Sequence, residues 1–344
     1  MSKLNFVVSV FLIVSSFFAL LPLSAFDGSS SAFSVSNESK DLNTITETRK
    51  VNEVLDEIEK HWNAHNIEKV IEFYDDRFVN GDGLNIDAVK ELTKDLWEAY
   101  PDIMSKAIEK TVRIQGDYAT IESTDVFEGS SSMIRPEVGT KGNLRATSAG
   151  QMFFKKFGTA WKVTSDKTLV EKVSIGYGIG AELLDQNKIQ ITAPEQVISG
   201  QQYTARLTFN LSDDIKPVAA ISKELLIYPQ VSVGDKFRLI GEKFIERLIN
   251  ANRISRNELV TATVGLTGGA LKPKLLGLVF LSRRVNVVPV SGDNSEISII
   301  KEPAKSSLNT DVDLLDKYPD KQLRELKEQN EPEENKKEPE FDSD

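Results

Sequence analysis

The spacing of apolar residues changes at Pro101, and this change limits the folds that the chain can adopt. Before Pro101 the apolar residues recur at helical spacing, as Val51, Leu55 and Ile58 do. After Pro101 they alternate with polar residues at every second position, which is typical of strands. Helices that come first and a run of strands that follows indicate an α+β fold.

Three helices are predicted before the change. The first carries Val51 to Trp62, the second is short and is capped by Asn66, and the third opens at Asn85 or Asp87 and ends at Pro101. Four strands follow, at Ile108–Ile114, Tyr118–Phe127, Leu144–Phe157 and from Trp161 to about Thr168, with turns at Gly116-Asp117 and Gly158-Thr159.

The second half of the chain, residues 185–291, shows strand patterns only. Alternation is clean over Tyr203–Leu211 and Val260–Leu266, and Lys188–Thr192, Lys223–Tyr228 and Leu275–Val290 supply further strands. This pattern predicts a β-sandwich of general immunoglobulin-like form. Ser174–Gly180 reads as a linker or an edge strand, and Glu242–Asn252 is left open between a helix and an irregular connection.

The stretch HWNAHNIEKVIEFYDDRFV at His61–Val79 reads as a helix, a break, a second helix, a Tyr-Asp-Asp turn and the start of a strand. With the third helix and the strands that end in Trp161-Lys162-Val163, this order resembles the nuclear transport factor 2-like (SnoaL-like) superfamily over residues 47–175. The resemblance implies a cone-shaped, curled sheet that three helices close around a pocket. The superfamily includes isomerases, cyclases, transport adaptors and inert binding modules, so it does not name an activity.

The resemblance also implies which side chains line the cone. The expected lining is aromatic with one amide: Trp62, Tyr74, Trp97, Tyr100, Gln151, Phe153 and Trp161. Such a pocket suits a small apolar ligand with one or two polar handles. The alternative is that these residues form an ordinary packed core.

Three carboxylates are weak catalytic candidates: Asp76, Asp82 and Asp125. Asp76 lies in the turn after Tyr74, where an Asp more often accepts local backbone hydrogen bonds than acts as a base. Asp125 shares a strand face with Ile121 and Phe127, so we expect it to point into the cone, where burial would raise its pKa.

The resemblance places the base of ketosteroid isomerase, a catalytic member of the superfamily, at Gly81 of this chain. Asp82 comes one residue later, and one residue along a strand is the opposite face unless a bulge restores the phase. The first helix offers His61 and Trp62 but no tyrosine to donate to an oxyanion. The isomerase mechanism is therefore not expected to carry over.

No metal site or cofactor is predicted. His61 and His65 have a helical i, i+4 spacing that can hold zinc, but no third ligand follows from the sequence. The chain also lacks a phosphate-binding glycine loop and a Gly-x-Ser-x-Gly elbow.

The N-terminal residues predict a secretory signal over residues 1–25, with Lys3, an apolar run at Phe6–Leu23 and a Leu-Ser-Ala cleavage site. A flexible, Ser-rich leader is expected over residues 26–46. No cysteine is present, which excludes a lipoprotein anchor and disulfides. We therefore expect an exported protein, periplasmic or extracellular.

The charge of the chain is acidic, with a formal net charge of -10. Residues 301–344 contain 8 basic and 14 acidic side chains, and residues 292–344 are expected to form a disordered acidic tail. This balance disfavours nucleic acid as a partner. The second half carries a locally basic series that we interpret as a solvated strand face: Arg247, Arg253, Arg256, Lys272, Lys274, Arg283 and Arg284.

The leading hypothesis is a non-catalytic protein that binds a small apolar ligand or an envelope protein. A homodimer through the open face of the first sheet is a further hypothesis, and an exposed apolar face on Leu144–Phe157 would support it. The rival hypothesis is a SnoaL-like isomerase, hydratase or cyclase of a small hydrophobic molecule, with Asp125 or Asp82 as its base.

Overall fold

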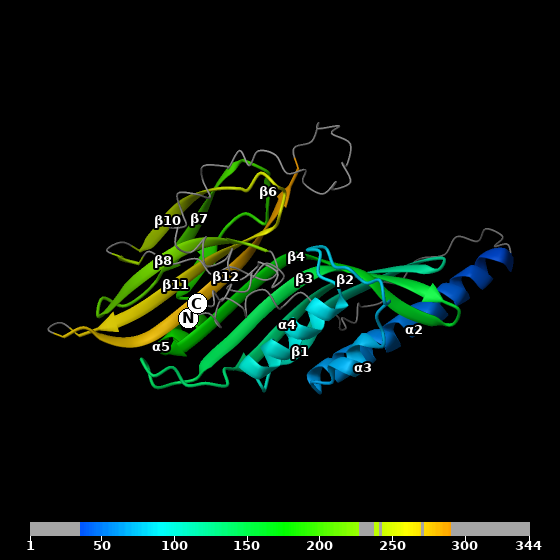
Figure 1. The fold of residues 1–344 in the computed structure, drawn as a ribbon, viewed down its shortest axis with the longest axis horizontal. Coiled ribbons are helices and arrows are strands. Elements are labelled where there is room, and N and C mark those ends of the chain that lie inside the picture. Colours follow the sequence, from blue (N-terminus) through cyan, green and yellow to red (C-terminus); the bar gives the residue numbers. More distant parts are fainter. Residues whose placement is uncertain (1–34, 227–236, 241–242, 270–271, 290–344) are drawn as a thin grey trace, which may run out of the picture. The chain divides into compact units, whose positions relative to one another are not determined.

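The computed structural model describes residues 35–226, 237–240, 243–269 and 272–289 (Figure 1), and the expected signal and acidic tail lie outside these residues. The helices are α2 (Val35–Asn63), α3 (Ile67–Ile71), α4 (Ile86–Ala99) and α5 (Ile179–Asp185). The strands are β1 (Met104–Gln115), β2 (Tyr118–Ser130), β3 (Gly142–Phe157), β4 (Ala160–Gly178), β5 (Ile189–Thr192), β6 (Gln196–Ile198), β7 (Gln202–Phe209), β8 (Ile215–Leu225), β9 (Arg238–Leu239), β10 (Phe244–Asn250), β11 (Glu258–Gly268) and β12 (Lys274–Val288).

The helices begin where the sequence supplies caps. The side chain of Asn66 accepts a hydrogen bond from the Lys69 amide at the start of α3, and Asn85 accepts one from Ala88 at the start of α4. Helix α2 starts at Val35, so the second part of the segment expected as a leader is helical. Within the described ranges, no helix has the length and hydropathy needed to cross a membrane.

The sheet that follows is antiparallel and curled, which confirms the α+β order (Figure 1). In the described part of the chain its path runs β1-β2-β3-β4-β12-β11-β8-β9, with β6 pairing in parallel to β12. A second sheet has the order β10-β7-β5. Segment 242–252, which the sequence left open, therefore contains a strand, β10.

Strand β4 belongs to both halves of the chain. Its residues pair with β3 along its length, and Lys172 to Gly178 also pair with β12, from Arg283 to Gly277. Reading Ser174–Gly180 as a linker or an edge strand was therefore wrong, because Ser174 to Gly178 have a neighbouring strand on each side. The glycines of this segment suggested an irregular connection. The structure requires them because α5 approaches β12 closely, and a Cβ on Gly180 would meet the Leu278 carbonyl.

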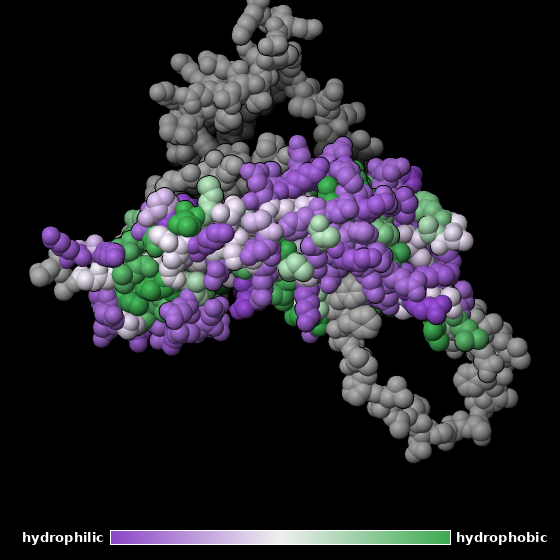
Figure 2. Space-filling view, turned by 90° about the horizontal axis from the view of Figure 1, so that it is seen from below, coloured by the Kyte–Doolittle hydropathy of each residue, from purple (hydrophilic) through white to green (hydrophobic). Residues whose placement is uncertain are grey.

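Two hydrophobic cores lie on opposite faces of this shared sheet. The first lies between helices α2 to α4 and strands β1 to β4. The second lies between the β10-β7-β5 sheet and strands β8, β11 and β12. The face of the molecule in Figure 2 is mostly hydrophilic, with separate hydrophobic patches. The immunoglobulin-like assignment of the second half stays a prediction.

Candidate functional site

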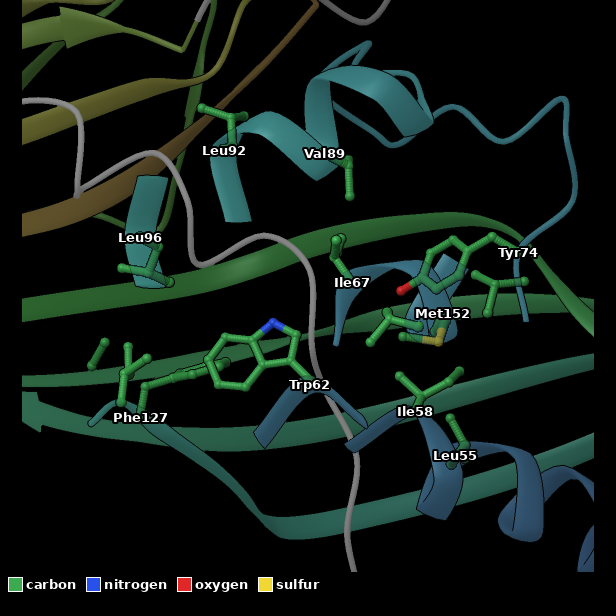
Figure 3. Close-up of a cluster of buried hydrophobic side chains, with 14 of the residues drawn as sticks. Leu55, Ile58, Trp62, Ile67, Tyr74, Val89, Leu92, Leu96, Phe127 and Met152 are labelled. Atoms are coloured by element: carbon green, nitrogen blue, oxygen red, sulfur yellow. The ribbon is translucent and has the colours of Figure 1, made fainter. Parts of the chain in front are cut away.

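The aromatic residues expected to line a cone lie together in the first core. Trp62, Tyr74, Trp97, Tyr100 and Trp161 are all buried there. Figure 3 shows Trp62 at the centre of the cluster, between side chains of α4 and of the sheet. Its ring meets Trp97 and Phe127 edge to face, with centroids 5.7 and 5.6 Å apart. These contacts are those of tight core packing.

Gln151 and Phe153 do not join this cluster. The buried side chains of β3 are at even positions, such as Met152 and Phe154, so Gln151 and Phe153 lie on the opposite, outer face. Gln151 donates its side-chain amide to Glu122 at 3.2 Å, also on the outer face. The expectation that these two residues line the cone is wrong, because the sequence alone does not show which face of this long strand is buried.

Asp82 forms a buried ion pair with Arg284. Its carboxylate accepts two hydrogen bonds from the Arg284 guanidinium, at 2.7 and 3.0 Å, and a third from the Asn257 side chain at 2.8 Å. The exposed fractions of the Asp82 and Arg284 side chains are 6% and 1%. The contact joins the segment after α3 to strand β12, so placing Arg284 on a solvated strand face was wrong.

The local structure around Asn80 aims Asp82 at this contact. The Asn80 side chain accepts hydrogen bonds from the amides of Asp82 and Leu84, and the Gly81 amide donates to the Asp166 carbonyl. Residues 80–84 thus form a turn, not the expected strand, and Val79 makes only an isolated bridge to Asn85. Strand alternation therefore does not decide where Asp82 points.

Two further carboxyls lie beside the Asp82–Arg284 pair, and sequence reasoning missed both. Asp166 and Glu171 of β4 are buried, and no oxygen of either carboxyl has a hydrogen-bond partner within the described residues. The pKa of both carboxyls is raised to about 8, mainly by burial and to a smaller extent by the charge of Asp82, with Arg284 opposing the change. Both groups are therefore mainly protonated at neutral pH.

Register explains why these side chains meet. Thr164 and Leu169 are extra residues in β4, and each shifts the pairing with β3 by one position. The bulge at Thr164 brings Asp166 to the face of β4 that carries Trp161 and Val163, and the bulge at Leu169 restores the original phase, so Glu171 lies on the same face. Bulges leave no clear mark in the sequence, so a regular alternation from Trp161 would have put Asp166 outside.

Asp125 lies on the inner face of β2, fully buried between Ile121 and Phe127. The Ser123 hydroxyl donates to its carboxylate at 3.3 Å. Across the sheet Asp125 pairs with Ser148, and Ser148 pairs with Glu171. A row of polar side chains therefore crosses the inner face of β2, β3 and β4.

The other candidates lie apart from this row. Asp76 is exposed in its turn, while its neighbour Asp75 accepts hydrogen bonds from the backbone and side chain of Arg77 at 2.9 and 3.2 Å. His61 lies 3.4 Å from Glu57, and His65 stacks on Trp97 after α2 has ended. The two histidines do not share a helical face, and the described residues contain no group of His, Cys, Asp and Glu suited to a metal ion.

A groove opens next to the Asp82–Arg284 pair. Its volume is about 830 Å³. One wall is the turn at Asp82–Asn85 with the first turns of α4, and Arg256 contributes from the other half of the chain. The groove carries charges of both signs, including Asp87, Lys90 and Lys94.

Neither a protein-family model nor a curated protein matches the chain. Solved structures match part of it. A putative scytalone dehydratase from Novosphingobium aromaticivorans is 14% identical over 38% of this chain and 86% of that chain, with a TM-score of 0.31. A nuclear transport factor 2-like superfamily protein from Salmonella enterica is 11% identical over 35% and 87%, with a TM-score of 0.29.

Bd1075 from Bdellovibrio bacteriovorus is 17% identical, with a TM-score of 0.30, and the match covers 39% of this chain and 42% of that one. The chain thus spans less than half of the Bdellovibrio protein. One of these three neighbours is named as an enzyme, but at such TM-scores the likeness carries no argument.

Proposed function

We propose that this chain is an exported, non-catalytic binding protein, with a nuclear transport factor 2-like first half and a β-sandwich second half. One observation carries the proposal: both oxygens of Asp82 are held by Arg284, and Asn257 adds a third bond. A carboxylate whose two oxygens both accept hydrogen bonds from one guanidinium is already engaged in a charge-assisted contact between two segments and is not placed to act on a ligand. The dense packing of Trp62 against Trp97 and Phe127 supports the same proposal.

Turnover assays on the mature protein test the absence of catalysis. Lactone, enone and polyketide-like compounds are the substrate classes to offer, and we expect no conversion above that of the Asp82→Asn variant. Enzyme-like rates in the parent protein that disappear in a variant of Asp82 or Asp125 would overturn the proposal. Export is tested separately, by mass spectrometry of the N-terminus of protein recovered outside the cytoplasm.

The proposed partner surface is the outer face of β1 to β4. In the described residues the helices cover the inner face of these strands, and the second sheet covers the outer face of β8, β11 and β12. The outer face of β1 to β4 carries partly exposed apolar side chains: Ile108, Val126, Ala149, Phe153 and Leu169. An apolar sheet face of this kind suits a second copy of the chain or an envelope protein.

Size-exclusion chromatography with light scattering tests whether two copies of the chain bind each other through this face. We expect a dimer that the Phe153→Glu substitution converts to a monomer with an unchanged circular-dichroism spectrum. Lys155→Glu, on the same face but near the end of β3, is the matched control. A parent protein that stays monomeric at high concentration would leave an envelope protein or a small ligand as the partner.

A second candidate function is an isomerase, hydratase or cyclase of a small hydrophobic molecule. The buried, protonated carboxyls of Asp166 and Glu171 favour it, because such groups can act as general acids near neutral pH. For this function, Asp166→Asn and Glu171→Gln would abolish turnover while Asp117→Asn, in an exposed turn, would not.

A further inference from the structure

The contact of Asp82 with Arg284 holds together two segments that are far apart in the sequence. Asp82 belongs to the 80–84 turn, whereas Arg284 lies on β12 and Asn257 just precedes β11. The same turn forms one wall of the groove, and Arg256 contributes to it from the segment before β11. The contact therefore fixes the distance between the two sides of the groove.

The buried charges around this contact are balanced only when Asp166 and Glu171 are both protonated. The 80–84 turn supplies Asp82, β4 supplies Asp166 and Glu171, and β12 supplies Arg284. Nearby, Tyr74 is buried and un-ionised, because burial and the neighbouring Asp166 raise its pKa. Lys167 is exposed, and from β3 only Ser148 and Met152 pair with these carboxyl residues. Arg284 thus balances Asp82 alone.

Ionisation of Asp166 or Glu171 would place a second negative charge in a buried site with one guanidinium. A buried carboxylate without a hydrogen-bond donor is strongly destabilised. It can gain water only if the surrounding segments separate, and the 80–84 turn is a segment that both donates a hydrogen bond to the Asp166 carbonyl and lines the groove.

We propose that Asp82, Arg284, Asp166 and Glu171 form a proton-dependent latch, closed while Asp166 and Glu171 carry protons and released when they ionise, which sets the width of the groove. Release frees the 80–84 turn from β4 and β12 without unfolding β2 and β3. A ligand or partner that binds the groove would then bind differently below and above the pH at which the latch opens.

Amide hydrogen exchange of the full chain, corrected for the intrinsic pH dependence of exchange, tests the latch. The reporters are the amides of Gly81, Asp82 and Leu84, each of which donates a hydrogen bond in the closed turn. We expect their protection to fall by about tenfold per pH unit for each group that ionises on opening, between about pH 6 and pH 8. Protection in β2 and β3 should change much less.

The Asp166→Asn/Glu171→Gln variant cannot ionise at these positions, so its turn should keep constant protection across the same range. Asp117→Asn/Glu182→Gln, two exposed positions, is the matched control and should behave as the parent protein. Each single variant should show an intermediate fall. A pH-independent parent turn, an unchanged fall in the first double variant, or an equal fall in β2 and β3 would overturn the latch.

Discussion

At the scale of single residues, Arg284 pairs with only one of the three buried carboxyls described around it. Its guanidinium reaches Asp82 with two hydrogen bonds and Asn286 with a third, of 2.8 Å. Arginine suits this role because its planar fork matches a carboxylate. Asp166 and Glu171 obtain no such partner among the described residues and are held as neutral acids instead.

Arg284→Met should destabilise the protein by about 3–5 kcal/mol, because it keeps the apolar stem but leaves Asp82 buried without its cation. Urea unfolding at neutral pH measures the loss. Arg113→Met is the control: its pair with Glu122 is exposed, at 3.4 Å, and should be worth less than about 1 kcal/mol. Asp82→Asn combined with Arg284→Met should cost less than the two single changes added together, and strict additivity would contradict the coupling.

Glu171→Gln should flatten the dependence of stability on pH. The pKa of Glu171 is raised from 4.5 to about 8, so its stabilising contribution is complete below pH 4.5 and is lost as pH rises through 8. The parent protein should lose about 1.4 kcal/mol per pH unit in this window from this one group. Melting temperatures from about pH 5 to pH 8 measure the slope, which should be no different in Glu182→Gln than in the parent protein.

At the scale of elements, Glu47 ties helix α2 to the sheet. Its buried carboxylate accepts the Trp161 indole N–H at 2.8 Å and contacts Lys50 and Lys156, both at 2.9 Å. Hydrogen bonds from Lys50 and then Lys156 lower the pKa of Glu47 from 4.5 to about 2. The helix is therefore anchored well before the first apolar residue that predicted it, Val51.

Glu47→Ala should cost about 1.5–3 kcal/mol, because Trp161 and Lys156 lose an ionised acceptor. The difference in stability between the parent protein and the variant should be largest above pH 4.5. It should shrink as pH falls toward 2, because the Glu47 carboxylate of the parent protein then becomes protonated. Thermal unfolding above pH 4.5 and near pH 2 measures this difference. Glu53→Ala, on the exposed side of α2, is the control, and a similar cost at both glutamates would contradict the anchor.

Gly178 lies at the end of β4, where this strand approaches β12 closely. Gly178 has a φ of +57°, and a Cβ there would meet the Leu276 carbonyl, so Gly178→Ala must both strain the backbone and separate β4 from β12. We expect a loss of at least about 2 kcal/mol or failure to fold. Gly265→Ala is the control because its Cβ would meet nothing closer than the Leu275 side chain, at 3.5 Å. Equal stability of the two variants would contradict this account.

The sequence predicts the elements better than it predicts the site. The sequence predicts α3 and α4 from helical spacing, from their Asn caps and from Pro101, because these signals are local. The bulges at Thr164 and Leu169 and the pairing of β4 with β12 depend on contacts between distant strands, so the meeting of Asp82, Asp166, Glu171 and Arg284 could not be foreseen. The position of Asp125 was foreseeable, because one uninterrupted alternation links it to Ile121 and Phe127.

At the scale of the whole molecule, the sheet shared through β4 and β12 makes the two halves depend on each other. Lys172 to Gly178 pair with β12, and the buried Asp82–Arg284 contact adds a side-chain tie between the same halves. Tyr177 also meets Phe280 of β12 edge to face, with centroids 6.0 Å apart. Separating the halves would expose a long strand edge and an unpaired buried charge.

We therefore expect the full chain to unfold in one cooperative transition, with equal calorimetric and van't Hoff enthalpies. Intrinsic fluorescence reports the first half, because Trp62, Trp97 and Trp161 all lie there, and circular dichroism reports strands of both halves. The two signals should change at the same temperature. Val279→Asp, which puts a charge into the second core, should lower both midpoints together. A variant that loses strand signal while the tryptophans stay native would show that the halves fold separately, and would contradict the coupling through β4 and β12.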